Sequence, residues 1–194
     1  MKIEKSVIVS FILMVAVASL YRVMPGRPMG FAPQIAMALF AGSIIKDKKY
    51  SFLLPLLSML VSDIIYQLLY MADLTTLQGF YTGQWINYIL IASVTFIGFL
   101  IQQKNVFKIV TGALAGATFY FIASNFAVWI GGGLGLNNLP YAKTFDGLMS
   151  CYIAALPFYT MSIYATLFFS AVLFGGYYLI NKFVVHKTTV HHLN

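Results

Sequence analysis

Long apolar stretches alternate with short polar segments along the whole chain. An apolar helix needs about 20 residues to cross the hydrocarbon core of a membrane. Six stretches approach or exceed this length, and the second is the shortest. They are Ser6–Val23, Phe31–Ile45, Ser51–Met71, Trp85–Ile101, Ile109–Ile130 and Tyr159–Phe183. The pattern therefore predicts an all-α integral membrane protein with six transmembrane helices.

The segment between the fifth and sixth stretches has a different character. Gly131–Lys143 is rich in glycine and asparagine, which predicts a loop. Thr144 and Asp146 are suited to cap the start of a helix, and Pro157 is suited to end one. We therefore expect a separate short helix over Thr144–Leu156, lying at the outer face of the membrane.

Composition supports a single membrane domain. The chain is 60% hydrophobic and 9% charged, whereas soluble domains carry about 25% charged residues. Such a chain cannot cover a water-facing surface, so the lipid bilayer is its expected surrounding. Residues 1–183 form the predicted domain, and residues 184–194 form a polar tail that we expect to be poorly ordered.

The basic residues predict which side each loop faces. Three of the twelve, Arg22, Arg27 and Lys143, fall in alternate gaps between the apolar stretches. The other nine are Lys2, Lys5, Lys46, Lys48, Lys49, Lys104, Lys108, Lys182 and Lys187. Cytoplasmic loops carry the excess of basic residues, so both termini are expected in the cytoplasm. The short loops favour a bacterial inner-membrane protein, and scattered basic residues give no nucleic-acid-binding face.

Asp63 is the strongest candidate for a binding residue. A carboxylate inside an apolar helix costs about 2.5–3.5 kcal/mol on insertion scales, so it should face the bundle interior with a partner. Tyr66, Gln67 and Tyr70 follow at helical spacing on the same face. This stripe predicts a ligand or ion contact. The alternative is a structural aspartate that binds backbone groups or a neighbouring helix.

Other candidates lie in the outer half of the predicted bundle. Asn125 and Trp129 share a face of the fifth stretch, although a buried asparagine also commonly bonds neighbouring helices. Arg22 and Arg27 are suited to neutralise an anionic ligand; lipid phosphate or pairing with Asp73 or Asp146 are the alternatives. The predicted binding set is Asp63, Tyr66, Gln67, Tyr70, Asn125, Trp129, Arg22 and Arg27.

The sequence offers little for catalysis or metal binding. It contains no phosphate-binding Walker loop, no zinc-protease motif and no nucleophile-elbow motif. Cys151 suits a small apolar filler, and His186, His191 and His192 are only a loose cluster in the tail. We therefore predict neither catalytic residues, nor a metal site, nor a cofactor.

Two blocks of sequence carry a resemblance to a known family. One is PMGFAPQIAMALFAG at residues 28–42 with FLLPLLSMLVSD at 52–63; the other is SNFAVW at 124–129 with CYIAALPF at 151–158. They resemble a family of small bacterial six-span proteins described only as transport proteins. That family in turn resembles the substrate-binding S components of energy-coupling factor vitamin transporters. The resemblance implies an S-component-like bundle with an outward-facing pocket, which hands its ligand on with a coupling subunit and ATPases.

These observations predict a carrier that binds a vitamin or similar micronutrient and performs no chemistry on it. Its energy would come from an energy-coupling factor type subunit or from the ligand gradient. One alternative is an accessory or structural membrane subunit that binds no small molecule. A weaker alternative is an intramembrane enzyme that uses Asp63 with Asn125, because one buried carboxylate lacks an evident catalytic partner.

Overall fold

The computed structural model describes the backbone of residues 5–135 and 137–191, with the side chains of 8–135 and 137–182. Regular structure in these ranges is helical, apart from one isolated β-bridge between Leu134 and Pro140. The helices are α1 (Lys5–Val23), α2 (Gln34–Ile44), the 3₁₀ helix η1 (Lys48–Phe52), α3 (Leu53–Met71), α4 (Gln84–Gly98), α5 (Val106–Ile130) and α6 (Phe145–His191). The prediction of an all-helical fold is thus confirmed for the described residues, which form six α-helices.

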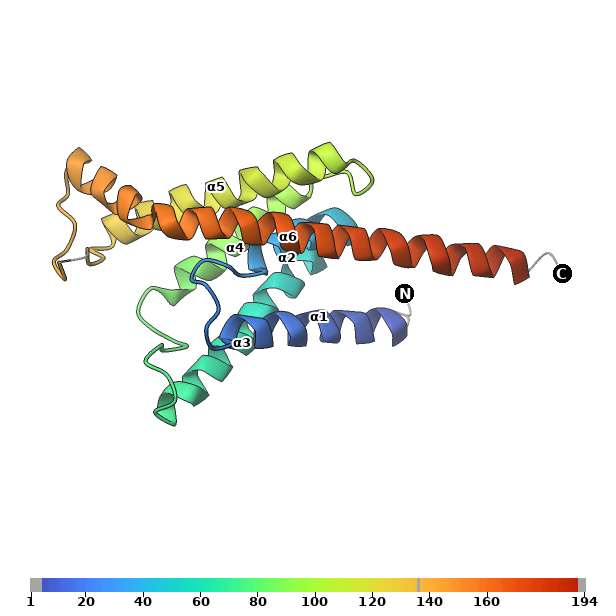
Figure 1. Cartoon of the computed structure of the whole chain (residues 1–194), viewed down its shortest axis with the longest axis horizontal. Helices are drawn as coiled ribbons and strands as arrows, with labels where there is room; N and C mark the ends of the chain where they lie inside the picture. Colours follow the sequence, from blue (N-terminus) through green and yellow to red (C-terminus); the bar gives the residue numbers. More distant parts are fainter. Residues whose placement is uncertain (1–4, 136, 192–194) are drawn as a thin grey trace.

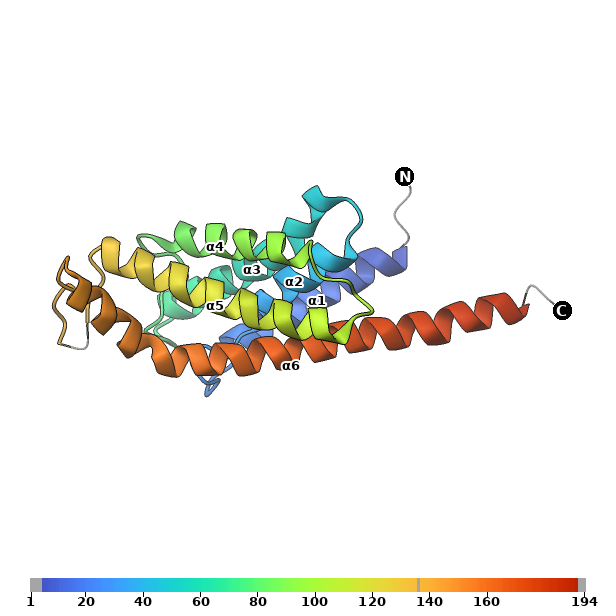
Figure 2. The same cartoon turned by 90° about the horizontal axis from the view of Figure 1, so that it is seen from above.

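The six α-helices form an elongated bundle with two distinct ends (Figure 1). One end carries the connections 24–33, 72–83 and 131–144, and we call it the loop end. The backbone of α1 begins and that of α6 finishes toward the opposite end, which we call the terminal end (Figures 1 and 2). The short connections α2–α3 and α4–α5 also lie there. This arrangement places the two ends of the described chain on one side of the bundle.

α2 is the central helix of the bundle. It packs against α3, α4, α5 and α6, and its residues from Gln34 to Gly42 are buried. Small side chains permit this close packing: a Cβ added at Gly98 of α4 would lie 2.6 Å from the Leu39 carbonyl oxygen of α2. Any larger residue at Gly98 would push the two backbones apart. The core of the protein is thus organised around a short apolar helix.

α6 corrects one prediction from the sequence. The Thr144 hydroxyl does accept a hydrogen bond from the Gly147 amide (3.2 Å), as expected of a helix start. Pro157, however, lies inside one continuous helix and does not end it. A proline removes one backbone hydrogen bond and bends a helix, and the first turns of α6 do run at an angle to the rest (Figures 1 and 2). α5 packs against α6 on both sides of this proline, since the Phe121 ring contacts both Tyr152 and Tyr159.

The predicted tail, residues 184–194, begins as a continuation of α6. The α6 backbone is helical to His191. His186 and His191 belong to this extension, whereas His192 lies outside the described residues. That the tail is poorly ordered stays a prediction.

Three helical segments are long and apolar enough to cross a membrane: Lys48–Met71, Val106–Ile130 and Phe145–Lys182. The remaining apolar helices are shorter, and α2 spans only about 16 Å at a rise of about 1.5 Å per residue. The bundle also exposes large apolar side chains, such as Leu13 and Val17 of α1. These features are compatible with a membrane protein.

Candidate binding site

Asp63 is the centre of a buried polar cluster on α3. Its side chain is almost completely buried, with 1% of the residue exposed. One carboxylate oxygen forms an ion pair with Arg22 of α1. The other accepts hydrogen bonds from the Gln84 amide (2.6 Å) and the Tyr88 hydroxyl (2.7 Å) of α4. The charge is thus compensated on both oxygens, which is what a carboxylate in an apolar surrounding requires.

Arg22 is held by this cluster on the side that faces α3. Its Nη1 also donates to the Ser62 hydroxyl (2.6 Å), and its guanidinium lies 5.7 Å from the centre of the Tyr66 ring. The Tyr66 hydroxyl donates to the Arg22 carbonyl oxygen (2.7 Å). The predicted alternatives for Arg22, pairing with Asp73 or Asp146, do not form among the described residues. Asp63 takes that place.

Arg27 is held differently, by backbone oxygens. Its Nε donates to the Arg22 carbonyl (3.0 Å), and its Nη1 donates to the carbonyls of Phe31 (2.8 Å) and Pro28 (3.2 Å). No carboxylate of the described chain lies within ion-pair distance of Arg27. The connection 24–33 therefore presents a positive charge that no carboxylate of the described residues neutralises.

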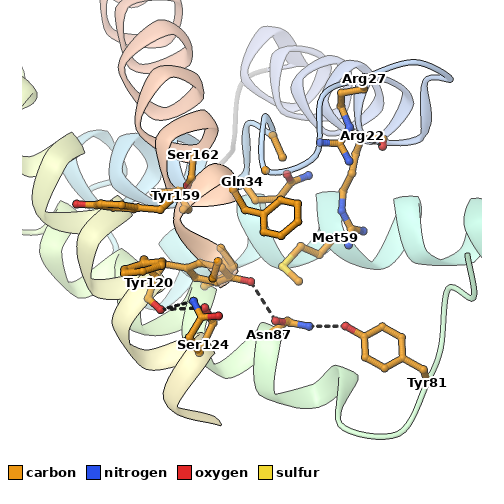
Figure 3. A pocket seen from close by; sticks show the side chains of 18 residues that line it. Arg22, Arg27, Gln34, Met59, Tyr81, Asn87, Tyr120, Ser124, Tyr159 and Ser162 are labelled. Atoms are coloured by element: carbon orange, nitrogen blue, oxygen red, sulfur yellow. Dashed lines mark hydrogen bonds between the residues drawn. The ribbon is translucent and has the colours of Figure 1, made fainter. Parts of the chain in front are cut away.

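Arg22 and Arg27 both line a cavity of about 390 Å³ near the loop end (Figure 3). This volume is within the range of small-molecule sites. Residues from α2 to α6 complete its walls. The polar ones are Gln34, Tyr81, Asn87, Tyr120, Ser124, Asn125, Tyr159 and Ser162, and the larger apolar ones are Ile35, Met59, Ile91, Phe121 and Phe158.

Gln34 is the most informative residue of this cavity. It is the first residue of α2 and is 5% exposed, yet neither its Nε2 nor its Oε1 has a hydrogen-bond partner among the described residues. Leaving such a buried group unpaired costs about 1–3 kcal/mol. The side chain lines the cavity (Figure 3). The amide thus offers its Nε2 as a hydrogen-bond donor and its Oε1 as an acceptor to whatever occupies that space.

A chain of hydrogen bonds runs from the cavity to the Asp63 cluster. The Tyr120 hydroxyl of α5 donates to the Asn87 side-chain oxygen (3.0 Å), and the Asn87 Nδ2 donates to the Tyr81 hydroxyl (2.8 Å; Figure 3). The same Nδ2 lies 3.1 Å from Oε1 of Gln84, which in turn binds Asp63. Burial raises the pKa of Tyr81, which lies in the 72–83 connection, so its hydroxyl stays protonated.

Aromatic rings form another wall of the cavity. Phe121 of α5 and Tyr159 of α6 are stacked, with ring centres 4.4 Å apart and planes inclined by 22°. The Tyr159 hydroxyl lies 2.8 Å from that of Thr118, which fixes the ring. Flat, rigid aromatic surfaces of this kind favour contact with a planar part of a ligand.

The predicted binding residues separate into three groups. Arg22, Arg27 and Asn125 line the cavity, and the Asn125 amide nitrogen donates to the Phe121 carbonyl of its own helix (2.8 Å). Asp63 and Tyr66 lie behind Arg22 and hold it. The cavity wall at α3 is Met59, which is one turn from Asp63.

The other three predicted residues lie away from the cavity lining. The Gln67 side-chain oxygen accepts a bond from the Phe80 amide (3.3 Å), so it anchors the 72–83 connection. Tyr70 is exposed near the end of α3. The Trp129 indole donates to the Ala142 carbonyl (2.8 Å) and ties down the 131–144 connection.

Sequence reasoning missed Gln34, Asn87 and Tyr120. Gln34 was detectable in principle, because it is a lone amide in an apolar stretch directly after Pro33. The roles of Asn87 and Tyr120 depend on the contact between α4 and α5, which the sequence does not display. Cys151 is buried against the backbone of Asn125 (3.5 Å), as the filler interpretation expects.

No curated protein and no solved structure matches this chain. A family model does match residues 2–189, which is nearly the whole chain. Its description is "Family of unknown function (DUF6580)". The chain therefore belongs to the DUF6580 family.

Proposed function

We propose that this protein is a multi-pass membrane carrier that binds a vitamin or similar micronutrient in the cavity at the loop end. The observation that carries the proposal is the unpaired Gln34 amide, which is buried and faces the cavity. A protein that used this region only for packing would gain stability by replacing such a group. A ligand that forms hydrogen bonds with both amide atoms would offset this cost and would explain why a glutamine stands at this position.

Charge and shape narrow the kind of ligand. Arg22 is balanced by Asp63, whereas Arg27 has no acidic partner in the part of the chain that the structure describes. The site thus carries a net positive charge at its edge, which favours an anionic or strongly electron-rich group on the ligand. The stacked pair Phe121–Tyr159 suits a planar ring. A ring-bearing molecule with one acidic group and an amide-like edge would satisfy all three features.

The same proposal includes six membrane crossings in the bacterial inner membrane. The connections 24–33, 72–83 and 131–144 gather at one end, which the distribution of basic residues predicts to be outside the cell. Short helices such as α2 and α4 would then require local thinning of the bilayer or irregular segments buried in protein. The cavity would open outward, and a coupling subunit with ATPases, or the ligand gradient, would drive uptake.

A direct test is native mass spectrometry of the detergent-purified protein. We expect a non-lipid small molecule to accompany the wild type and to be lost in Gln34→Leu. The matched control is Gln67→Leu, because Gln67 has the same side chain, bonds the Phe80 amide and does not line the cavity. Equal retention of the molecule by both variants, or its absence from the wild type at saturating extract concentrations, would contradict the proposal.

A second candidate function has its own support. Both oxygens of Asp63 are satisfied inside the protein, and Arg22 has no freedom to leave them without cost. These bonds favour a structural role for Asp63. Such a role fits an accessory membrane subunit that binds no small molecule. Thermal stability separates the two candidates, since a ligand raises the unfolding temperature of a binding protein, and the increase grows with the logarithm of the ligand concentration.

A further inference from the structure

A second hollow lies at the terminal end, between the beginning of α5 and the last third of the described α6 side chains. Its volume is about 480 Å³. Val106, Ile109 and Val110 form one wall, and Leu167 and Phe174 form the other. Gly175 leaves the groove open, because a Cβ added there would meet no atom within 4 Å. This is an apolar groove on the side of the bundle.

A polar pocket of about 490 Å³ adjoins this groove. The two hollows share Gln103, Lys104 and Tyr178, so they form one continuous surface. Asn181 and Lys182 are further walls of the polar pocket. Neither Lys104 nor Lys182 pairs with a carboxylate of the described residues. The polar half thus presents two ammonium groups to one small volume.

Ser170 lies deeper in the apolar half of the groove. It comes twelve residues before Lys182, which is about 18 Å along α6 at a rise of about 1.5 Å per residue. At that depth the groove would hold an acyl chain, so the two lysines and the apolar channel beside them are the features that indicate the occupant.

We propose that this composite groove binds one anionic phospholipid. The phosphate would lie between Lys104 and Lys182, and an acyl chain would follow the apolar half past Gly175. Basic pockets between helices on the cytoplasmic side of membrane proteins commonly hold anionic head groups. Two ammonium groups above an apolar channel fit that ligand better than a neutral lipid, which leaves both charges unpaired. The inference requires a membrane location and does not depend on the carrier role.

The test is lipid titration of the detergent-purified full chain, followed by native mass spectrometry. Palmitoyl-oleoyl phosphatidylglycerol should bind roughly ten-fold more tightly than palmitoyl-oleoyl phosphatidylcholine. A difference of this size is typical of the attraction between basic residues and an anionic lipid. Lys104→Ala/Lys182→Ala should abolish that preference. Lys46→Ala/Lys49→Ala removes the same charge from the α2–α3 connection and should retain it, since neither residue lines the groove.

Gly175→Leu extends the test to the acyl chain. The new side chain would enter the open groove, so binding of both lipids should fall, while unchanged helical circular dichroism shows that the fold persists. If both double lysine variants lost the preference for phosphatidylglycerol to the same extent, the proposal would be overturned. That result would show that anionic lipids are attracted to the terminal end in general and not to this groove. Competition by glycerol 3-phosphate at equal concentration would also overturn it, because the site would then recognise free phosphate. Either failure leaves the Gln34 test unaffected.

Discussion

The Asp63 cluster and the Gln34 cavity are neighbouring polar regions with opposite bonding states. Asp63 has a partner on each oxygen, and its partners Arg22, Gln84 and Tyr88 come from two other helices. Gln34 is almost as buried and has no partner on either amide atom among the residues described. A polar group whose bonds are complete stabilises the fold, whereas one whose bonds are open costs stability until something else completes them. The comparison separates a structural centre from a binding surface.

The largest effect is expected from Asp63→Ala. The substitution leaves Arg22 as an uncompensated charge and removes the acceptor of Gln84 and Tyr88, so the free energy of unfolding should fall by about 3–5 kcal/mol. Thermal unfolding in detergent measures this. Asp73→Asn is the control, because Asp73 lies in the exposed 72–83 connection and forms no ion pair in the described structure. Asparagine removes the charge and tolerates the positive φ of this position (56°).

A double variant sharpens that result. Arg22→Met/Asp63→Leu replaces the ion pair by apolar groups, which is often neutral or stabilising at buried sites. It should recover the part of the loss that comes from the uncompensated Arg22 charge, whereas the Gln84 and Tyr88 donors remain without their acceptor. A double variant as unstable as the single one would show that the shape of the cluster, and not its charge balance, supports the fold.

Gln34→Leu should change the free energy of unfolding in the opposite direction from Asp63→Ala. Removing the unpaired amide is expected to leave the ligand-free protein unchanged or more stable, by up to about 1–3 kcal/mol. The same substitution should abolish stabilisation by the ligand. Differential scanning fluorimetry with and without a cell extract measures both quantities. A loss of stability comparable to that of Asp63→Ala would mean that Gln34 is bonded within the protein.

A smaller effect is expected from Tyr120→Phe. It removes the hydroxyl that donates to Asn87 and keeps the ring in place, so the cost should be about 1 kcal/mol. Tyr164→Phe is the matched control, because Tyr164 is exposed on α6. Equal melting temperatures for the two variants would show that the hydrogen-bond chain between the cavity and Asp63 contributes nothing.

The elements that the sequence predicted well are those with a strong local signal. Asp63 stood out because a carboxylate is costly in an apolar stretch, and the structure does surround it with partners. Gln34 did not stand out, because an uncharged amide is tolerated in apolar helices and its lack of partners is a tertiary property. The network through Asn87 and Tyr120 required knowledge of which helices touch.

The same distinction explains the helix boundaries. The rule that proline ends a helix is local, and α6 continues through Pro157 with α5 packed against it on both sides of the proline. The shortness of α2 does have a local cause, because Phe31 and Ala32 lie between Pro28 and Pro33 and fold as an irregular connection. The hydrophobic pattern thus located the six α-helices, but not η1 and not all of their boundaries.

The most direct test of the central claim is an electron-density or cryo-electron-microscopy map of the protein purified from its own cells without added ligand. We predict non-protein density larger than a water molecule in the cavity, within hydrogen-bond distance (about 2.7–3.2 Å) of Gln34 Nε2 or Oε1. A map in which both amide atoms bond to protein groups, or in which only ordered water fills the cavity, would contradict it.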